Sequence, residues 1–149
     1  MTKQLNAFLI IGFALLSLLL LLSASALFIY HHGFDPKELF LHYAGDEKAF
    51  INPKSFTGIL KSFSPHILVM PLIFFILFHL VIAIKAFPQE QIKYIAIIGF
   101  GATFGDIFIN FIISWSILFA YLKLIFFLLF QFVLIYIISG FFKKAFLEN

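Results

Sequence analysis

Four long apolar stretches, separated by short polar segments, occupy most of this 149-residue chain. Each reaches the roughly 20 apolar residues that an α-helix needs to cross a bilayer core of about 30 Å. None shows the apolar/polar alternation of a membrane-barrel strand, and a spanning segment must satisfy its own backbone hydrogen bonds. The pattern predicts an all-α, polytopic membrane protein, an antiparallel four-transmembrane-helix bundle in a single domain over residues 1–149. We place the helices at about residues 5–30, 65–87, 89–119 and 121–142.

The one substantial polar segment, residues 31–63, joins the first two of these helices. Residues 35–38, Asp-Pro-Lys-Glu, have the capping-box pattern that starts a short helix. Leu39, Phe40 and Tyr43 would form its membrane-facing side, so we expect a short amphipathic helix that lies on the membrane surface as a lid over the bundle. The next long helix should begin at Pro65, with Ser64 as its N-cap.

The composition agrees with a membrane protein and excludes several kinds of chemistry. With 63% hydrophobic and 11% charged residues, the chain has too little polar surface for a soluble domain. The absence of cysteine excludes disulfides, iron–sulfur clusters and covalently attached haem. The net charge is only +3, and the lysines lie beside the membrane segments instead of forming a patch, which argues against nucleic-acid binding.

The distribution of lysine predicts the orientation of the bundle, because the cytoplasmic ends of membrane helices carry an excess of positive charge. Five lysines lie close to the membrane ends on the side of the termini: Lys3, Lys85, Lys93, Lys143 and Lys144. We therefore expect both termini in the cytoplasm, with the chain in a bacterial inner membrane. The first apolar segment includes Ala24-Ser25-Ala26, which resembles a signal-peptidase site, but its length favours a retained helix.

An intramembrane histidine is the first candidate for chemistry. His79 lies six residues before Lys85, inside the hydrocarbon, where an ionisable side chain is a functional candidate by default. Matching depths across the helices places Gly99 and Tyr136 near the same level, and glycine would let a flat haem approach the backbone. These residues predict a haem b site with an imidazole ligand. The alternative is tight helix packing at the glycine, with His79 hydrogen-bonded to Tyr136.

Four more histidines gather at the outer end of the bundle: His31, His32, His42 and His66. Imidazoles at one depth can bind haem, copper or zinc, and we take His66 and His79 as the first candidates for ligands of a haem iron. Those two lie 13 residues apart, about 20 Å along a helix and about 140° around it, which does not match a two-haem cytochrome b. The alternative is a set of interfacial histidines solvated among lipid headgroups.

Polar residues follow one face of the third predicted helix: Thr103, Asp106 and Asn110. A carboxylate near mid-membrane is costly, so Asp106 must face the bundle interior, with Gln131 of the fourth helix as the expected hydrogen-bond partner. The stripe predicts either a proton relay or a polar edge for a haem propionate or a quinone. The alternative is structural, with interhelical hydrogen bonds that hold the helices together.

A series of short motifs lies between residues 42 and 80: His42, Gly45, Pro53-Lys54-Ser55-Phe56, Pro65-His66 and His79-Leu80. In this order they resemble a family of small, uncharacterised bacterial four-helix integral membrane proteins, in which an outer loop leads into a second helix with a pair of histidines. The resemblance implies that His66 and His79 act together, in haem binding or electron transfer.

These observations favour a small b-type haem-binding membrane protein that serves as an electron-transfer or quinone-linked respiratory subunit, and not an independent enzyme. Two alternatives stay open: a cofactor-free accessory or assembly subunit of a larger membrane complex, and metal or proton transport. The expected partners are the lipid bilayer, other membrane subunits, and a quinone or a redox protein. A homodimer is a further possibility, because two copies would supply the paired His79 ligands that one copy lacks.

Overall fold

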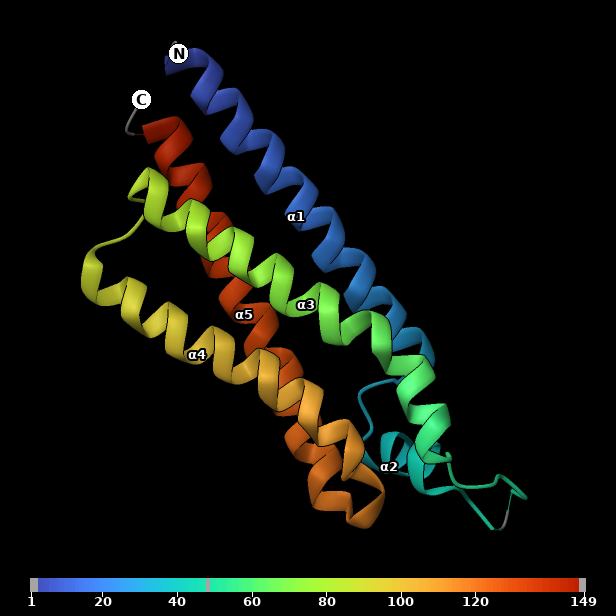
Figure 1. The fold of residues 1–149 in the computed structure, drawn as a ribbon. Helices are drawn as coiled ribbons and strands as arrows, with labels where there is room; N and C mark the ends of the chain where they lie inside the picture. The colour runs from blue at the N-terminus through green and yellow to red at the C-terminus, as the bar shows by residue number, and fades with distance from the viewer. Residues whose placement is uncertain (1–2, 48, 148–149) are drawn as a thin grey trace.

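The computed structural model describes residues 3–47 and 49–147, which are helical apart from the connections and one isolated bridge between Asp46 and Ile51. The elements, shown in Figure 1, are α1 Lys3–His32, α2 Pro36–Ala44, α3 Phe56–Ile84, α4 Gln89–Phe108, the 3₁₀ turns η1 Ile109–Phe111 and η2 Ile113–Trp115, and α5 Ile117–Leu147. Four of them, α1, α3, α4 and α5, contain an apolar stretch long enough to cross a bilayer. The prediction of an all-α protein with four transmembrane helices is confirmed.

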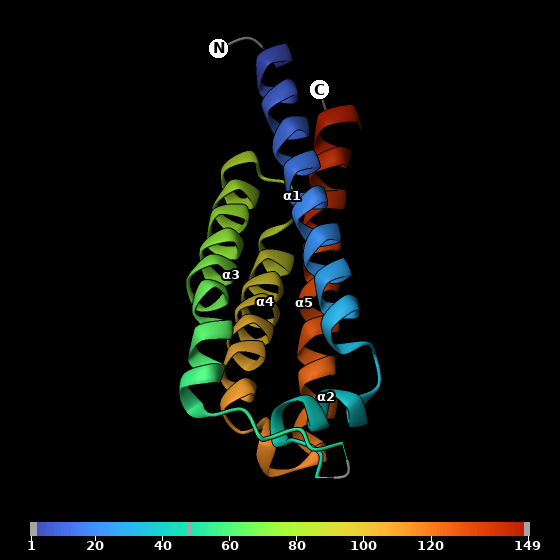
Figure 2. The same ribbon diagram turned by 90° about the vertical axis from the view of Figure 1, so that its right-hand side faces the viewer.

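The long helix α5 packs against each of the other three transmembrane helices. Successive long helices run in opposite directions, so the start of α1 and the end of α5 lie at one end of the bundle (Figures 1 and 2). The short helix α2 lies at the opposite end. Within the described ranges α1 and α3 share no close backbone contact, so these two helices are joined mainly through α5.

The second transmembrane helix begins earlier than the sequence predicted. It starts at Phe56, where the hydroxyl of Ser55 accepts the N–H of Gly58 at 3.1 Å, and not at Pro65. Ile59 and Phe63 are buried, so the apolar face of the helix continues ahead of the proline. Residues 56–63, predicted as the last part of the 31–63 loop, therefore belong to α3.

The third transmembrane helix, predicted to reach residue 119, ends at Phe108 and gives way to the two 3₁₀ turns. The side-chain amide of Asn110 donates to the carbonyl oxygens of Asp106 and Ile107, and so competes with the backbone amides that would continue the helix. The last helix, in contrast, passes its predicted end at residue 142, because Ala145 still continues the buried face.

The short helix predicted in the first loop is present as α2. The Asp35 side chain accepts the N–H of Lys37 at 2.8 Å at its start, and Gly45 ends it with a positive φ of 83°. Leu39 and Tyr43 are buried against the bundle, where α2 packs on α5 and η2. The apolar side of α2 thus covers the end of the bundle, as expected of a lid.

Candidate functional site

The residues predicted for haem binding at mid-membrane do not come together. His79 is exposed on α3, and its Nδ1 is hydrogen-bonded to the backbone oxygen of Phe75 at 2.8 Å. The hydroxyl of Tyr136 instead donates to the side-chain oxygen of Gln91 at 3.1 Å. The space beside Gly99 holds the ring of Phe74, which a Cβ on the glycine would meet at 2.0 Å. The glycine therefore serves close helix packing, the alternative reading of this position.

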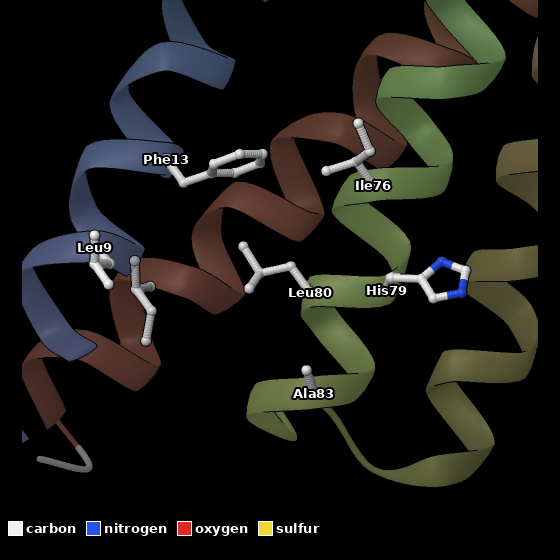
Figure 3. Close-up of a pocket in the computed structure, with 7 residues that line it drawn as sticks. Leu9, Phe13, Ile76, His79, Leu80 and Ala83 are labelled. Atoms are coloured by element: carbon white, nitrogen blue, oxygen red, sulfur yellow. The ribbon is translucent and has the colours of Figure 1, made fainter. Parts of the chain in front are cut away.

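A cavity of about 420 Å³ lies beside His79, between α1 and α3. Its other lining residues are apolar, and the ring of His79 points away from Leu9 and Phe13 on α1 (Figure 3). A flat molecule in this cavity would therefore meet hydrocarbon walls and not the ring nitrogens of the histidine.

The outer histidines are only partly described. The side chains of His31, His32 and His66 lie outside the described part of the structure, so their predicted cluster stays a prediction. His42 is half-buried on α2. In the part of the chain that the structure describes, no group of three or more histidine, aspartate or glutamate side chains is placed to hold a metal ion.

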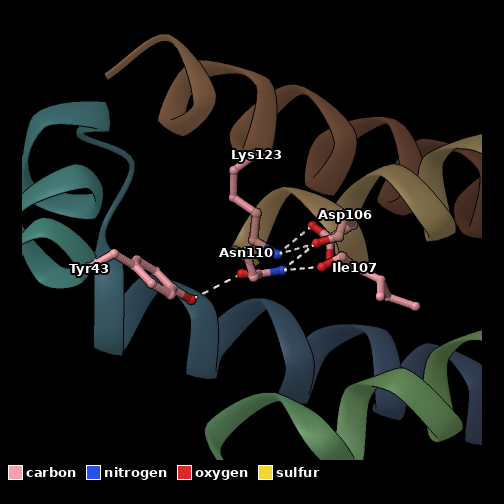
Figure 4. Close-up of polar contacts among 5 residues, drawn as sticks. All are labelled: Tyr43, Asp106, Ile107, Asn110 and Lys123. Atoms are coloured by element: carbon pink, nitrogen blue, oxygen red, sulfur yellow. Dashed lines mark hydrogen bonds and ion pairs between the residues drawn. The ribbon is translucent and has the colours of Figure 1, made fainter. Parts of the chain in front are cut away.

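The polar residues at the lid end form a connected cluster inside the bundle (Figure 4). Asp106 on α4 is an ion-pair partner of Lys123 on α5, whose Nζ donates to Oδ1 at 2.8 Å and to the Asp106 backbone oxygen at 3.1 Å. The two side chains are only 3% and 6% exposed. An isolated charge at such a position is costly, so the pair gives each charge its counter-charge.

The position of Lys123 differs from the sequence prediction, which placed the lysines beside the membrane segments and not inside the bundle. The structure buries it in α5, six residues after the helix begins at Ile117. The sequence does contain an indication of this position. Lys123 lies between two leucines in a long apolar run, and a charged residue in such a run is expected to pair with an acidic residue at similar depth. The expected bond between Asp106 and Gln131 is replaced by this ion pair.

The cluster continues from the ion pair to the lid. Asn110 is fully buried, and its Oδ1 accepts a hydrogen bond from the hydroxyl of Tyr43 at 3.0 Å. Burial, and then the negative charge of Asp106, raise the pKa of Tyr43 to about 12. The Thr103 hydroxyl, also buried, donates to the Gly99 carbonyl oxygen of its own helix at 2.7 Å. Three polar groups from different elements, Tyr43, Asn110 and the ion pair, thus meet beneath α2.

A second, larger cavity of about 600 Å³ begins at this cluster and extends into the bundle between α1, α3 and α5. Lys123 and Ile138 both line it and lie 15 residues apart on α5, which is about 22 Å along a helix. The groups near its Lys123 end include the ion pair, Asn110 and Tyr43, whereas Leu134 and Ile138 line the other end. The cavity is therefore elongated, with a polar end beneath the lid and an apolar end beyond the middle of α5.

Gln131 lies between these two ends. It is 9% exposed and lines the cavity eight residues, or about 12 Å, beyond Lys123. Within residues 3–47 and 49–147 its buried side-chain oxygen has no hydrogen-bond partner. Buried polar atoms are nearly always hydrogen-bonded in folded proteins, so this oxygen is available to a donor on a bound molecule or to water.

Lys54 and His42 complete the polar end of the cavity. The Nζ of Lys54 is hydrogen-bonded to Nε2 of His42 and lies 4.9 Å from the centre of the Tyr43 ring. Burial lowers the pKa of Lys54. The sequence predicted His42 in this region but no role for Lys54, or for Tyr43 as a polar group, because their convergence depends on how the lid folds back.

Residues 33–148 match a family described as a transmembrane helical domain, and the chain belongs to this family. The matched range includes α2 and every ionisable residue that lines the larger cavity. No curated protein and no solved structure matches the chain.

Proposed function

We propose that this member of the transmembrane helical domain family is an intramembrane binding protein for a single-chain amphiphile. One observation carries the proposal: the cavity of about 600 Å³ is elongated along the bundle, polar beneath the lid and apolar beyond the middle of α5. Its volume lies within the range of about 300–1,000 Å³ that is usual for small-molecule sites. A molecule with one polar head and one apolar chain matches both the length and the polarity of this space.

The rim of the cavity supports an exchange of ligand with the bilayer. Leu20 and Leu27 of α1 and Val69 of α3 line the cavity and are exposed on the surface of the bundle. They lie on the two helices that share no close backbone contact within the described ranges. A lipid-soluble ligand would therefore pass between α1 and α3 without crossing water.

Haem b and a role in electron transfer remain predictions. Among the described histidine side chains, His42 lines the larger cavity, and its Nε2 is bonded to Lys54. A quinone, the other redox molecule that the sequence suggested, belongs to the class of amphiphiles that this proposal covers. Accessory-subunit and transport functions likewise remain predictions.

The test is native mass spectrometry of the detergent-purified protein, with a visible spectrum of the same sample. We expect about one amphiphile per chain, bound saturably. Ala24→Trp should abolish binding, because Ala24 lines the cavity and the larger ring would fill it. The matched control is Ala26→Trp, at an exposed position of the same helix outside the cavity.

The proposal is wrong if the wild-type protein binds no amphiphile, or if both tryptophan variants bind as well as the wild type does. A haem spectrum that persists in Ala24→Trp would show that any haem lies outside this cavity.

A further inference from the structure

The charges that line the larger cavity do not balance. Asp106 and Lys123 compensate each other at 2.8 Å. Lys54 is the other lysine in the lining, and no carboxylate pairs with it among the described residues. The polar end of the cavity therefore carries one excess positive charge when Lys54 is protonated.

The position of Lys54 is fixed by its surroundings. Its backbone N–H donates to the carbonyl oxygen of Tyr43 at 3.0 Å, which attaches this segment to the end of α2. Its ammonium group lies between the His42 ring nitrogen and the face of the Tyr43 ring. A charged lysine only donates hydrogen bonds, so Nε2 of His42 is the acceptor and the imidazole is neutral. The cation is thus held at the polar end of the cavity by two uncharged groups.

We infer that the head group of the bound amphiphile is an anion, a carboxylate or a phosphate monoester, and that Lys54 is its counter-charge. This inference rests on the proposed function and names the ligand class for the same cavity. A half-buried ammonium without a carboxylate gains a charge-assisted hydrogen bond when an anion binds. The compensated pair Asp106–Lys123 offers no comparable net charge, and its own hydrogen bonds are already made.

The apolar chain of the ligand would extend past Gln131 toward Ile138. The same cavity would accept a neutral amphiphile of equal length, but without an ion pair to Lys54. The distinction between an anionic and a neutral head is therefore a distinction in affinity, and it depends on one side chain.

The experiment titrates the full chain in detergent with palmitate, hexadecyl phosphate and hexadecanol, each followed by native mass spectrometry. These probes share the length of their apolar chain and differ in the head group. We expect at least one of the two anions to bind about tenfold or more tightly than hexadecanol. A preference for palmitate would identify a fatty acid, and a preference for hexadecyl phosphate would identify a phosphate ester.

Variants of Lys54 then assign the preference. Lys54→Gln should lower the affinity for the anion about tenfold or more and so remove the preference over hexadecanol, while an unchanged far-ultraviolet circular dichroism spectrum reports that the variant is folded. Lys54→Arg keeps the positive charge and should retain the preference. Lys61→Gln, at an exposed position of α3 outside the cavity, is the matched control and should behave as the wild type.

The outcomes separate the two proposals. Equal affinity for hexadecanol and both anions, or a preference that survives in Lys54→Gln, would overturn the anionic head group and leave the binding function in place. Failure of all three probes to bind the wild-type protein would overturn the binding function itself.

Discussion

Removing one partner of the Asp106–Lys123 pair should destabilise the bundle far more than removing both. The Lys123 side chain is only 6% exposed, and Asp106→Asn removes the carboxylate that pairs with its ammonium group. The backbone oxygen of residue 106, at 3.1 Å, remains as a hydrogen-bond acceptor. Lys123→Met leaves the carboxylate without its cation. Breaking a buried ion pair from one side costs about 3–5 kcal/mol, and the remaining backbone acceptor places Asp106→Asn at about 3 kcal/mol.

The double variant Asp106→Asn/Lys123→Met buries no charge at this point. Replacement of a buried ion pair by neutral groups of similar volume is often nearly neutral, so we expect a loss of about 1 kcal/mol or less. With about 3 kcal/mol or more for each single variant and about 1 kcal/mol or less for the double variant, the double-mutant cycle should give a coupling of about 5 kcal/mol between the two sites.

The measurement is the free energy of unfolding in mixed micelles, followed by far-ultraviolet circular dichroism as the denaturing detergent is increased. Lys61→Met, on the exposed side of α3, is the control and should leave the unfolding free energy unchanged. Single variants that each cost under about 1 kcal/mol, or a double variant that costs their sum, would refute the reasoning from the buried pair.

Two further predictions concern packing and the lid. Gly99→Ala should destabilise the bundle by about 1–3 kcal/mol, because the new Cβ would meet the Phe74 ring at 2.0 Å. Gly101→Ala is the control and should not destabilise it, because a Cβ there would meet nothing within 4 Å. Equal unfolding free energies for the two variants would contradict this packing. The raised pKa of Tyr43 means that the folded state favours the protonated phenol, so its stabilisation is fully present below pH 10 and is lost as the pH rises to about 12. In the wild type, the unfolding free energy should therefore fall by up to about 3 kcal/mol between about pH 10 and about pH 12, and in Tyr43→Phe this fall should disappear. If the variant shows the same fall as the wild type, other groups cause it.

The hydropathy pattern predicted the four helices because each polar group left in hydrocarbon costs several kcal/mol, which restricts spanning segments to long apolar runs. The same cost placed Asp106 in the interior. The pairing of Asp106 with Lys123 was not accessible in this way, because it depends on how α4 and α5 rotate about their axes after η1 and η2 replace the end of the predicted third helix. The partner that fills the space beside Gly99 likewise depends on packing, since the sequence marks the space but not the Phe74 ring.

The contact between Lys54 and His42 in the cavity could not be predicted from the sequence either. Lys54 and His42 lie 12 residues apart, on opposite sides of the turn that contains the Asp46–Ile51 bridge. Nothing in their spacing indicates contact, because no regular element joins them. Their convergence follows from the backbone bond between Lys54 and Tyr43, which the turn makes possible.

The two ends of the cavity differ in how a ligand can leave, and this difference predicts the route of exchange. At the polar end, α2 is held by the Tyr43–Asn110 hydrogen bond, by the backbone bond from Lys54, and by the burial of Leu39. At the side, α1 and α3 share no close backbone contact in the described ranges. Separating these two helices breaks fewer interactions than lifting the lid, so the amphiphile should leave sideways into the bilayer.

This route is testable through the dissociation rate of a bound amphiphile. Leu27→Trp places a larger side chain at the exposed rim and should slow dissociation, whereas Ile29→Trp, exposed on the same helix outside the cavity, should not. Leu39→Ala weakens the packing of the lid by about 2–5 kcal/mol at a position outside the cavity lining, and it should leave the rate unchanged because the lid need not open. Faster dissociation in Leu39→Ala, with no effect of Leu27→Trp, would show that the ligand leaves beneath α2 instead.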